Sequence, residues 1–416
     1  MKVLVIGSRV PYPLHDGGAI ATFNMLKGIA ETGCEVDFIT LNTHKHFIET
    51  DIAKQKMPFL KSYVDFEINT NINPFDAFFN LFSNKSYNIE RFYNQKFEQI
   101  LVARIEAKKY DIIHFEGLFV GKYLLAINSL LEYSSATITY DTRVGDGPAL
   151  VLRQHNIEFQ IWERLAQNEP NIFKKLYLKL LAKRLKKFEK EITSGFKYIS
   201  TIAKTDEDTL NEWKTCSIIK TIPSGYDVKP MVPVPLDNNS IYHIGSMEWM
   251  PNIEAMQWFI QKIFPLVVAK NKLAKFYVAG KKMPLEFSQF QSENIKIVGE
   301  VADLENFIGG KSILVVPLKS GSGIRIKTIE AMMQGKAVIT TTTGAQGLLI
   351  KHHEHCLIAD TEKEMAEAIL LLLSDISLRN KIALAGQELM KSVYDNKVVA
   401  KQWLNFYEEI ILQINR

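Results

Sequence analysis

The stretch ILVVPLKSGSGIRIKTIEAMMQGKAVITT, residues 313–341, reads as strand, loop, helix and strand in direct succession. The apolar run 313–316 predicts a strand that ends at Pro317, a helix is expected over 325–334, and AVITT predicts the next strand. The same alternation runs along most of the chain. Because continuous apolar strands between helices are typical of a parallel sheet covered on both faces, we predict an α/β protein.

The length of 416 residues is long for one hydrophobic core and favours two domains. KVLVIGS, DIIHFE, ATITYD and KYISTIA are strand-like segments of the first half, and a proline-rich linker spans 223–236. We therefore predict two facing, doubly wound, Rossmann-like domains, 1–222 and 223–396, with a C-terminal helix at about 397–416 packing back on the first. Ligands of such sheets bind at the carboxyl ends of the strands.

Composition excludes several classes of protein. The net charge of +4 is too small to indicate nucleic-acid binding, and three scattered cysteines indicate a reducing compartment without disulfides. No apolar stretch reaches the ~18 residues that span a bilayer, and KVLVIGSRV at the N-terminus has strand length and no signal-peptide pattern. We expect a soluble, cytoplasmic protein.

The glycines of 321–328 suggest a phosphate-binding loop, but two known fingerprints fail. A P-loop needs a second glycine where this chain has Ile326, and the dinucleotide pattern G-x-G-x-x-G fails at the same residue. What remains is a glycine loop followed by Arg325, Lys327 and Glu330 at the start of a helix. Two cations and a helix N-terminus favour a multiply charged anion, and a carboxylate nearby favours ribose hydroxyls. A capped, solvated helix start is the alternative interpretation.

This stretch resembles the donor-nucleotide motif of retaining glycosyltransferases of the GT-B fold, family four, in the form G-x-G-x-R-x-K-x-x-E-A-M followed by G-x-x-V. YPLHDGGAIATFNMLKGIAETGCEVDFIT, RQHNIEFQIWERLA and IYHIGSMEWMPNIEAMQWFIQKIFPLV are similar to other segments of that family. The resemblance covers nearly the whole chain. It implies a nucleoside diphosphate sugar of the UDP or GDP type as donor, transfer with retention, and no metal or other cofactor.

The resemblance assigns the site residue by residue. Glu330 matches the second glutamate of the family's E-x7-E motif, which binds the ribose, whereas Ser322 stands where relatives carry the first glutamate. GSMEWMPN, residues 245–252, lacks the arginine and lysine of many relatives, so Arg325 and Lys327 are expected to meet the diphosphate charge. The expected donor-binding set is Gly17, Gly18, Ser322, Gly323, Ile324, Arg325, Lys327 and Glu330.

In the first domain the resemblance points to PLHDGGAIATF and RQHNIE. The pair Gly17 and Gly18 is expected to approach the donor phosphate, with His15 and Asp16 on the acceptor side, although a simple helix-entry turn is the alternative. His155 follows an apolar strand and is expected beside the reacting sugar or acceptor, as a catalytic-site contact with Arg325 and Lys327.

Two motifs suggest metal binding at first sight. DED at 206–208 better suits the first turn of a helix capped by Thr205. The three histidines of KHHEHC, residues 351–356, lack zinc-site spacing and indicate a polar loop. We therefore expect no metal.

The segment KKLYLKLLAKRLKKFEK, 174–190, carries eight cations and one acid, with leucines at helical spacing. A basic amphipathic helix of this kind can lie peripherally on the inner, anionic face of a membrane. A domain helix whose leucines face the core is the alternative.

Together these features predict a glycosyltransferase that moves a sugar to a hydroxyl of a glycan, lipid-linked or small-molecule acceptor. A nucleotide-sugar epimerase of the same fold and a non-catalytic, donor-binding partner subunit are the rival hypotheses, and Ser322 keeps the second open.

Overall fold

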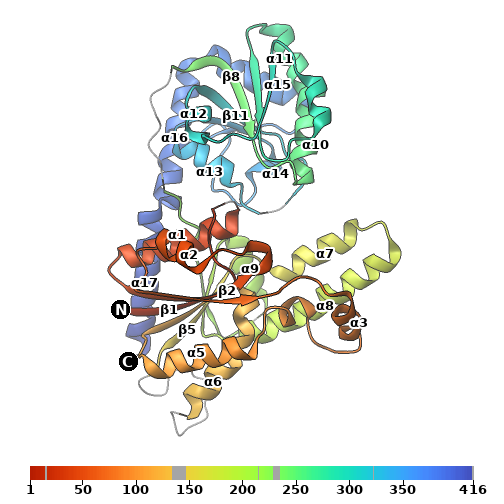
Figure 1. Ribbon diagram of the computed structural model, residues 1–416. Helices are drawn as coiled ribbons and strands as arrows, with labels where there is room; N and C mark the ends of the chain where they lie inside the picture. Colours follow the sequence, from red (N-terminus) through yellow and green to blue (C-terminus); the bar gives the residue numbers. More distant parts are fainter. Residues whose placement is uncertain (15, 134–146, 214, 228–234, 322, 415–416) are drawn as a thin grey trace. The chain divides into compact units, whose positions relative to one another are not determined.

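The computed structural model describes residues 1–14, 16–133, 147–213, 215–227, 235–321 and 323–414. The chain forms two compact units, one of Met1–Gly225 with Asn396–Arg416 and the other of Tyr226–Asp395 (Figure 1). Each unit is built on a single sheet whose strands all run parallel. The predicted α/β class with two parallel-sheet domains is confirmed. The expected strand ATITYD lies outside the described residues.

The N-terminal unit contains a seven-stranded sheet of order β3-β2-β1-β4-β5-β6-β7. Its strands are β1 (Lys2–Gly7), β2 (Glu35–Thr43), β3 (Ser62–Ile68), β4 (Ile112–Glu116), β5 (Ala149–Gln154), β6 (Tyr198–Thr201) and β7 (Ile218–Thr221). The register pairs Gly7 with Thr40 on one side and with Glu116 on the other, and Glu116 with Arg153. The carboxyl ends of the central strands therefore meet at one edge of the sheet.

Helices cover both faces of this sheet. They are α1 (Gly17–Glu31), α2 (Thr50–Lys56), α3 (Pro74–Asn80), α4 (Tyr87–Glu90), α5 (Gln95–Ala107), α6 (Leu124–Tyr133), α7 (Glu158–Asn168), α8 (Ile172–Ser194), α9 (Lys204–Glu212) and α17 (Asn396–Ile414), with 3-10 turns η1 (His44–His46) and η2 (Leu118–Tyr123). Successive strand residues point to opposite faces, so Val3 and Val5 pack in one core while Leu4 and Ile6 pack in the other.

The last helix, α17, belongs to the core of the N-terminal unit. Trp403 and Tyr407 are fully buried there, in the same core as Met25 and Leu26 of α1. The indole of Trp403 lies edge-on to the imidazole of His114 in β4, with ring centroids 5.1 Å apart. Residues from opposite ends of the chain thus complete one core.

The basic helix α8 is a domain helix over its C-terminal half and an exposed one over its N-terminal half. Leu181 and Leu185 are buried in the core, as the domain-helix interpretation predicts. Leu176 is 57% exposed, and Phe173 is 80% exposed. Helix α7 runs beside α8 (Figure 1). The ammonium of Lys186 in α8 lies 4.3 Å from the ring centroid of Phe159 in α7.

The C-terminal unit contains a six-stranded sheet of order β10-β9-β8-β11-β12-β13. Its strands are β8 (Asp237–Ile244), β9 (Lys275–Ala279), β10 (Ile295–Gly299), β11 (Lys311–Val316), β12 (Ala337–Thr340) and β13 (Leu357–Ile358). Its helices are α10 (Met250–Trp258), the π-helical segment η3 (Phe259–Ile263), α11 (Phe264–Lys270), the 3-10 turn η4 (Leu285–Phe290), α12 (Leu304–Gly309), α13 (Ile326–Met333), α14 (Thr342–Ala345), α15 (Glu362–Ser374) and α16 (Ile376–Tyr394). Across the described residues, no helix combines the length and the hydropathy needed to span a membrane.

We expect Trp403→Ala to destabilise the protein by about 3–5 kcal/mol, because it removes a fully buried indole and leaves a cavity between α17 and β4. Leu412→Ala on the same helix is the control, since Leu412 is 62% exposed and its truncation should change the free energy of unfolding by less than about 0.5 kcal/mol. Urea unfolding followed by circular dichroism measures both. Equal unfolding midpoints for the two variants would contradict the assignment of α17 to the core.

Candidate functional site

The loop between β11 and α13 turns sharply at two glycines. Gly321 and Gly323 have φ angles of +107° and +86°, which lie in the left-handed region that favours glycine. A Cβ atom at Gly321 would also come within 2.5 Å of the Trp249 ring. The glycines of the motif therefore shape this turn. Ser322 between them lies outside the described residues.

Arg325 lies at the junction of loop and helix, because α13 begins at the next residue. Its Nη1 donates to the carbonyl oxygen of Gly323 at 2.8 Å, and its guanidinium lies 5.2 Å from the Trp249 ring centroid. The side chain is buried, and this burial lowers the pKa of Arg325. The neighbouring Ile324 points toward Gly347, where an added Cβ would lie 3.2 Å from its Cγ1.

Lys327 lies in the first turn of α13 and reaches across to β8 and α10. Its Nζ lies 3.1 Å from Nε2 of His243 and 2.9 Å from Oδ1 of Asn252. Burial, together with repulsion from the Arg325 guanidinium, lowers the pKa of Lys327 to about 7. An added Cβ at Gly245 would lie 2.7 Å from this ammonium, so the charge sits at the end of the first strand of the unit.

The protonation of His243 follows from its partners. Its Nδ1 lies 2.8 Å from the carbonyl oxygen of Val315, which can only accept, so Nδ1 carries the proton. Burial and the charge of Lys327 hold the pKa of His243 well below its ordinary value. The neutral ring therefore offers Nε2 as an acceptor to Lys327. Both partners of the ammonium are uncharged, which leaves its charge available for an anion.

Glu330 lies one turn further along α13 and is half-buried. Burial raises the pKa of Tyr242 in β8, and the charge of Glu330 raises it further, which places the carboxylate near that strand. Arg325, Lys327 and Glu330 therefore all lie at the start of one helix, next to the end of β8.

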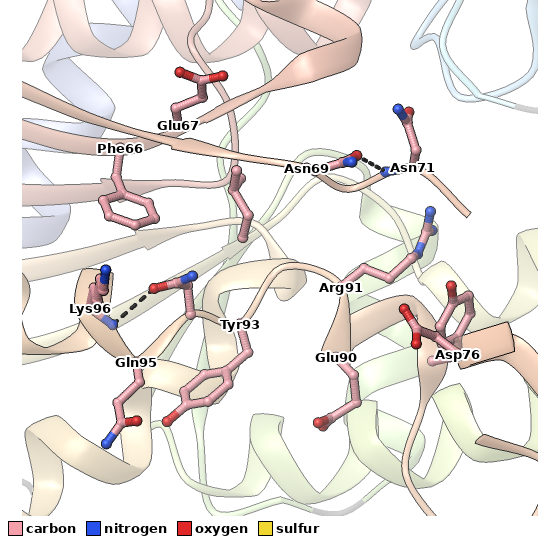
Figure 2. Close-up of a pocket in the computed structure, with 13 residues that line it drawn as sticks. Phe66, Glu67, Asn69, Asn71, Asp76, Glu90, Arg91, Tyr93, Gln95 and Lys96 are labelled. Atoms are coloured by element: carbon pink, nitrogen blue, oxygen red, sulfur yellow. Dashed lines mark hydrogen bonds between the residues drawn. The ribbon is translucent and has the colours of Figure 1, made fainter. Parts of the chain in front are cut away.

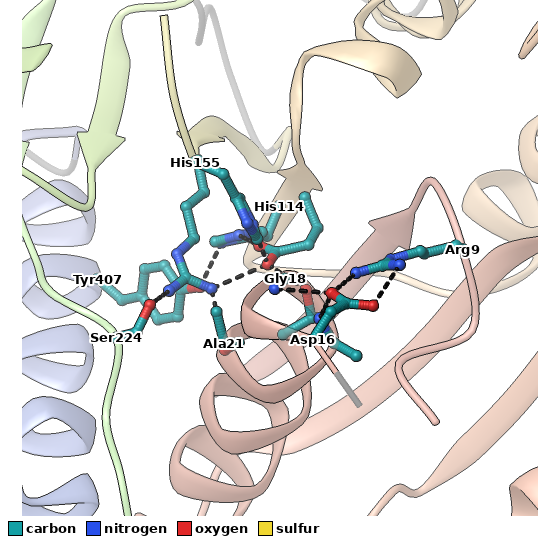
Figure 3. Close-up of polar contacts among 12 residues, drawn as sticks. Arg9, Asp16, Gly18, Ala21, His114, His155, Ser224 and Tyr407 are labelled. Carbon is teal, nitrogen blue, oxygen red and sulfur yellow. Dashed lines mark hydrogen bonds and ion pairs between the residues drawn. The ribbon is translucent and has the colours of Figure 1, made fainter. Parts of the chain in front are cut away.

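In the N-terminal unit, Asp16 caps helix α1. Its Oδ1 accepts from the backbone N–H groups of Gly18 and Ala19 at 3.0 and 3.1 Å, and its carboxylate pairs with the guanidinium of Arg9 (Figure 3). An added Cβ at Gly18 would lie 2.7 Å from Nη2 of Arg9. Gly17 is the first residue of the helix, so the pair forms the helix-entry turn. His15 lies outside the described residues.

A buried carboxylate, Glu116, organises the carboxyl ends of β4 and β5. Its Oε1 accepts from Nη1 of Arg153 at 2.8 Å, from Nε2 of His155 at 2.7 Å and from the Thr22 hydroxyl at 2.8 Å (Figure 3). Burial alone would raise the pKa of Glu116, but Arg153 and then His155 hold it well below its ordinary value. The carboxylate is therefore ionised.

The other oxygen of Glu116 joins this group to the C-terminal helix. Its Oε2 lies 3.0 Å from Nε2 of His114, and Nδ1 of His114 lies 2.7 Å from the Tyr407 hydroxyl (Figure 3). Burial lowers the pKa of His114 and raises that of Tyr407, so both groups are neutral. Since the carboxylate can only accept, Nε2 of His114 donates to it and Nδ1 accepts from Tyr407.

The same argument sets the orientation of His155. Its Nε2 donates to Glu116, so in the neutral form of the ring Nδ1 is the nitrogen that can accept from a bound hydroxyl. The side chain is 20% exposed and lines a cavity. Of the residues predicted for the N-terminal domain, His155 and Gly18 border this cavity, and so does Arg9, the unpredicted partner of Asp16.

This cavity, which we call the strand-end pocket, has a volume of about 620 Å³ and lies at the carboxyl ends of β1 to β5. Its lining includes Ser8, Arg9, Thr43, Lys45, His46, Thr70, Asn71, Ile72, Arg91, Glu116, Gly117, His155, Asn156 and Glu158. Burial, followed by the charges of Arg9 and Lys45, lowers the pKa of His46, and the Asp16 carboxylate opposes this shift. The pocket thus offers hydroxyl-binding groups and cations together.

A second cavity, the side pocket, has a volume of about 660 Å³ and shares Asn71 and Arg91 with the first. Figure 2 shows Arg91 beside Asp76 of α3, with Tyr93, Gln95 and Lys96 further along the lining. Nη1 of Arg91 donates to the carbonyl oxygen of Thr70 at 2.7 Å. Arg91 therefore forms part of a shared wall between two adjoining cavities.

The DED segment begins helix α9, but the predicted cap is wrong. The helix starts at Lys204 with Ala203 as its N-cap residue, so Thr205 lies inside the first turn. Burial raises the pKa of Asp206 to about 6 and that of Glu158, near the strand-end pocket, to about 7.

In the histidine loop, the rings of His352 and His353 lie 3.8 Å apart. Among the described residues, no cluster of three or more potential ligands for a metal ion comes together.

Both the sequence and the fold of this chain are similar to those of known proteins. Residues 238–375 match the family described as Glycosyl transferases group 1. The chain is 25% identical over 409 residues to an uncharacterised 44.6 kDa protein of the cps region of Klebsiella pneumoniae, covering 96% of this chain and 97% of that protein. Sucrose-phosphate synthase of Thermosynechococcus elongatus has a similar structure, with a TM-score of 0.66, 15% identity, and coverage of 99% of this chain and 100% of that one.

HepE of Anabaena, crystallised with UDP-glucose, is also similar, with a TM-score of 0.60, 12% identity, and coverage of 98% of this chain and 100% of that one. The chain has the GT-B fold. The match over 238–375 covers Arg325, Lys327 and Glu330. Together these findings support a glycosyltransferase of the GT-B type.

Three residues near the candidate sites of this GT-B chain were not predicted from the sequence. Glu116 and Arg153 are charged residues at the ends of otherwise apolar strands, and that pattern is a usable signal. Their pairing depends on the register between β4 and β5, which the sequence does not state. His243 is a buried polar residue near the end of β8, and only the fold brings α13 to it.

We expect Arg153→Met to destabilise the protein by about 3–5 kcal/mol, because it leaves the buried Glu116 carboxylate without its guanidinium. The double variant Arg153→Met/Glu116→Gln should recover part of this loss, since no buried charge then lacks a partner. Arg164→Met on the exposed side of α7 is the matched control. Urea unfolding of the four proteins measures the effect, and an Arg153→Met cost no larger than that of Arg164→Met would refute the buried ion pair.

Proposed function

We propose that the protein transfers a sugar from a nucleoside diphosphate sugar of the UDP or GDP type to a hydroxyl of a glycan, lipid-linked or small-molecule acceptor. The observation that carries this proposal is the charge at the start of α13. Arg325 and Lys327 lie at one helix start, and the partners of the Lys327 ammonium, His243 and Asn252, are neutral. A departing diphosphate is an anion of the kind that this arrangement stabilises.

The donor-site roles in the proposal follow from this placement. Lys327 and Arg325 stabilise the diphosphate, and Glu330, next along the helix, accepts hydrogen bonds from the ribose hydroxyls. Gly323 and Ile324 contribute backbone amides to the same anion, and Ser322 replaces a family carboxylate. The backbone at Gly17 and Gly18 approaches the donor phosphate. The binding of UDP-glucose by a structural neighbour supports a nucleotide-sugar donor.

The strand-end pocket is the proposed acceptor site. His155 accepts a hydrogen bond from the acceptor hydroxyl through Nδ1, because its other nitrogen donates to Glu116. Asp16 and His15 complete this side of the site in the proposal. The relation to a protein of a cps region supports polysaccharide biosynthesis as the setting. We further propose a cytoplasmic protein that contacts a membrane peripherally through 174–190.

The proposed reaction retains the anomeric configuration and uses no metal. The bond between the anomeric carbon and the diphosphate oxygen breaks, and the acceptor oxygen forms its new bond on the same face of the sugar. The acceptor proton passes to the leaving phosphate oxygen. Arg325 and Lys327 lower the energy of the transition state because negative charge develops on the diphosphate.

A panel of nucleotide sugars tests the function. The pure protein should slowly hydrolyse one of them to the nucleoside diphosphate in the absence of acceptor, and Arg325→Ala or Lys327→Ala should each reduce that rate by at least about 10-fold. Arg164→Ala, far from the charge cluster in sequence and exposed, is the control. Conversion of the sugar to its epimer would instead identify an epimerase. If no nucleotide raises the melting temperature, the chain is a partner subunit without donor binding.

The pKa of Lys327 gives a second test. The unliganded pKa is about 7, and an anion raises it, so binding takes up a proton wherever the pH exceeds that value. The affinity for the nucleotide sugar that binds should therefore be constant below about pH 6.5 and should fall by up to about 10-fold per unit toward pH 8.5. Calorimetric titration measures this. Lys327→Met should bind more weakly with a flatter profile, and an unchanged slope in that variant would exclude Lys327 from the anion site.

A further inference from the structure

Helix α3 presents phenylalanines to the exterior. Phe75, Phe78 and Phe79 lie in this helix and Phe82 follows two residues after its end, and they are 76%, 57%, 68% and 79% exposed. Ile72, one turn earlier, is 65% exposed. Phe78 packs against its neighbours on this face, with ring centroids 5.9 Å from Phe79 and 5.6 Å from Phe82. A contiguous exposed apolar face of this kind indicates a binding surface.

The helix is held from its ends and from its polar side, so its aromatic face is directed outward. Arg184 of α8 donates to the carbonyl oxygens of Asn80 and Leu81 at 2.8 and 2.9 Å. At the other end, the Tyr87 hydroxyl accepts from the N–H of Asn73 at 3.0 Å. Asn80 is half-buried while the phenylalanines are exposed. No residue of α3 is buried, so the helix lies on the surface with its phenylalanines uncovered by the core.

Helix α8 extends the same surface, since Arg184 joins it to α3 (Figure 1). Phe173, Leu176, Leu180, Lys183 and Lys187 recur at intervals of three or four residues and therefore share one face of α8. Phe173 and Leu176 are 80% and 57% exposed, whereas the core side of the helix carries Leu181 and Leu185. The face is apolar near the N-terminus of α8 and basic further along.

We infer that α3 and the N-terminal half of α8 bind the surface of an anionic phospholipid bilayer, with the phenylalanines inserted among the acyl chains. Residues 172–188 carry seven cations and no acid, and although Lys174 and Lys186 pair with Glu169 and Glu163, the net charge beside the apolar face is positive. Phenylalanine next to lysine is the composition of helices that lie in a membrane interface. This lipid-binding face takes up only the N-terminal part of the leucine stripe expected from the sequence, because Leu181 and Leu185 are in the core.

A bilayer fits this face better than a second copy of the chain does. In a symmetric dimer the same patch meets itself, which would bring the lysines of two α8 helices together. That repulsion opposes self-association, whereas an anionic lipid surface complements both the charge and the apolar face.

The lipid-binding face adjoins the cavities of the N-terminal unit. Ile72 lines the strand-end pocket, and Asp76 of α3 lines the side pocket. An acceptor anchored in the bilayer would therefore reach the strand-end pocket from the surface on which the protein sits. This consequence rests on the proposed sugar transfer, whereas the lipid binding deepens the proposed membrane contact and needs no transfer activity.

Vesicle sedimentation tests the inference without any activity measurement. The full chain should bind vesicles of phosphatidylcholine with about one quarter phosphatidylglycerol, and should bind pure phosphatidylcholine at least about 10-fold more weakly. Phe75→Ser/Phe79→Ser/Phe82→Ser should lose at least about 10-fold in partitioning to the anionic vesicles. Lys179→Glu/Lys183→Glu should lose the preference for anionic lipid.

Matched controls come from the C-terminal unit. Leu266→Ser/Leu273→Ser/Leu285→Ser removes three leucines that are 44%, 69% and 92% exposed, and Lys270→Glu/Lys272→Glu reverses two exposed lysines. Both should bind vesicles as the unaltered protein does. Circular dichroism and melting temperature should be unchanged in every variant, because each altered side chain is on the surface.

Three outcomes would overturn the inference. The unaltered protein could fail to bind either kind of vesicle, or the phenylalanine variant could bind as well as its leucine control. Alternatively, light scattering without lipid could show a dimer that the phenylalanine variant converts to a monomer, which would assign the face to a second copy. If the unaltered protein binds the anionic vesicles but hydrolyses no nucleotide sugar, only the proposed sugar transfer is refuted.

Discussion

The N-terminal unit depends on one buried carboxylate. Glu116 can remain ionised in the core only because Arg153 supplies the opposite charge and Thr22, His114 and His155 supply hydrogen bonds. These partners come from α1, β4 and β5 and the segment after β5, and Tyr407 of α17 continues the network. The requirement to satisfy a single charge therefore fixes how the strand ends, the first helix and the last helix meet. The orientation of His155 toward the strand-end pocket is a consequence.

In the C-terminal unit the buried charge of Lys327 has no oppositely charged partner among the described residues. Lys327 has two neutral partners, His243 and Asn252, and no carboxylate in the described part of the chain forms an ion pair with its ammonium. Burial and the nearby charge of Arg325 lower its pKa to about 7. The charge of Glu116 is balanced by Arg153 within the protein, so this group stabilises the fold. The charge of Lys327 has only neutral hydrogen-bond partners, so a bound anion would stabilise it. Glu116 therefore has a structural role, and Lys327 is the candidate for ligand binding.

The exposed phenylalanines of α3 depart from the usual burial of large apolar side chains. No residue of the helix is buried, and Arg184 binds the backbone at the end of the helix. Places where a sequence contradicts the usual burial pattern are often functional, because some other interaction must maintain them. Here the cations of α8 border the same surface, so charge and apolar area act together on one partner.

The sequence alone determined the class of fold, because the apolar strands, the helix periodicity and the glycine loop at 321–323 are local signals. It also identified Arg325, Lys327 and Glu330 as neighbours, since they lie within six residues. It could not identify the partners of Lys327 or the pairing of Glu116 with Arg153, which depend on strand register and on contacts between residues far apart in the chain. Nor could it separate the buried leucines of α8 from the exposed ones. Helical spacing groups residues on a face, and only tertiary packing decides which face is covered.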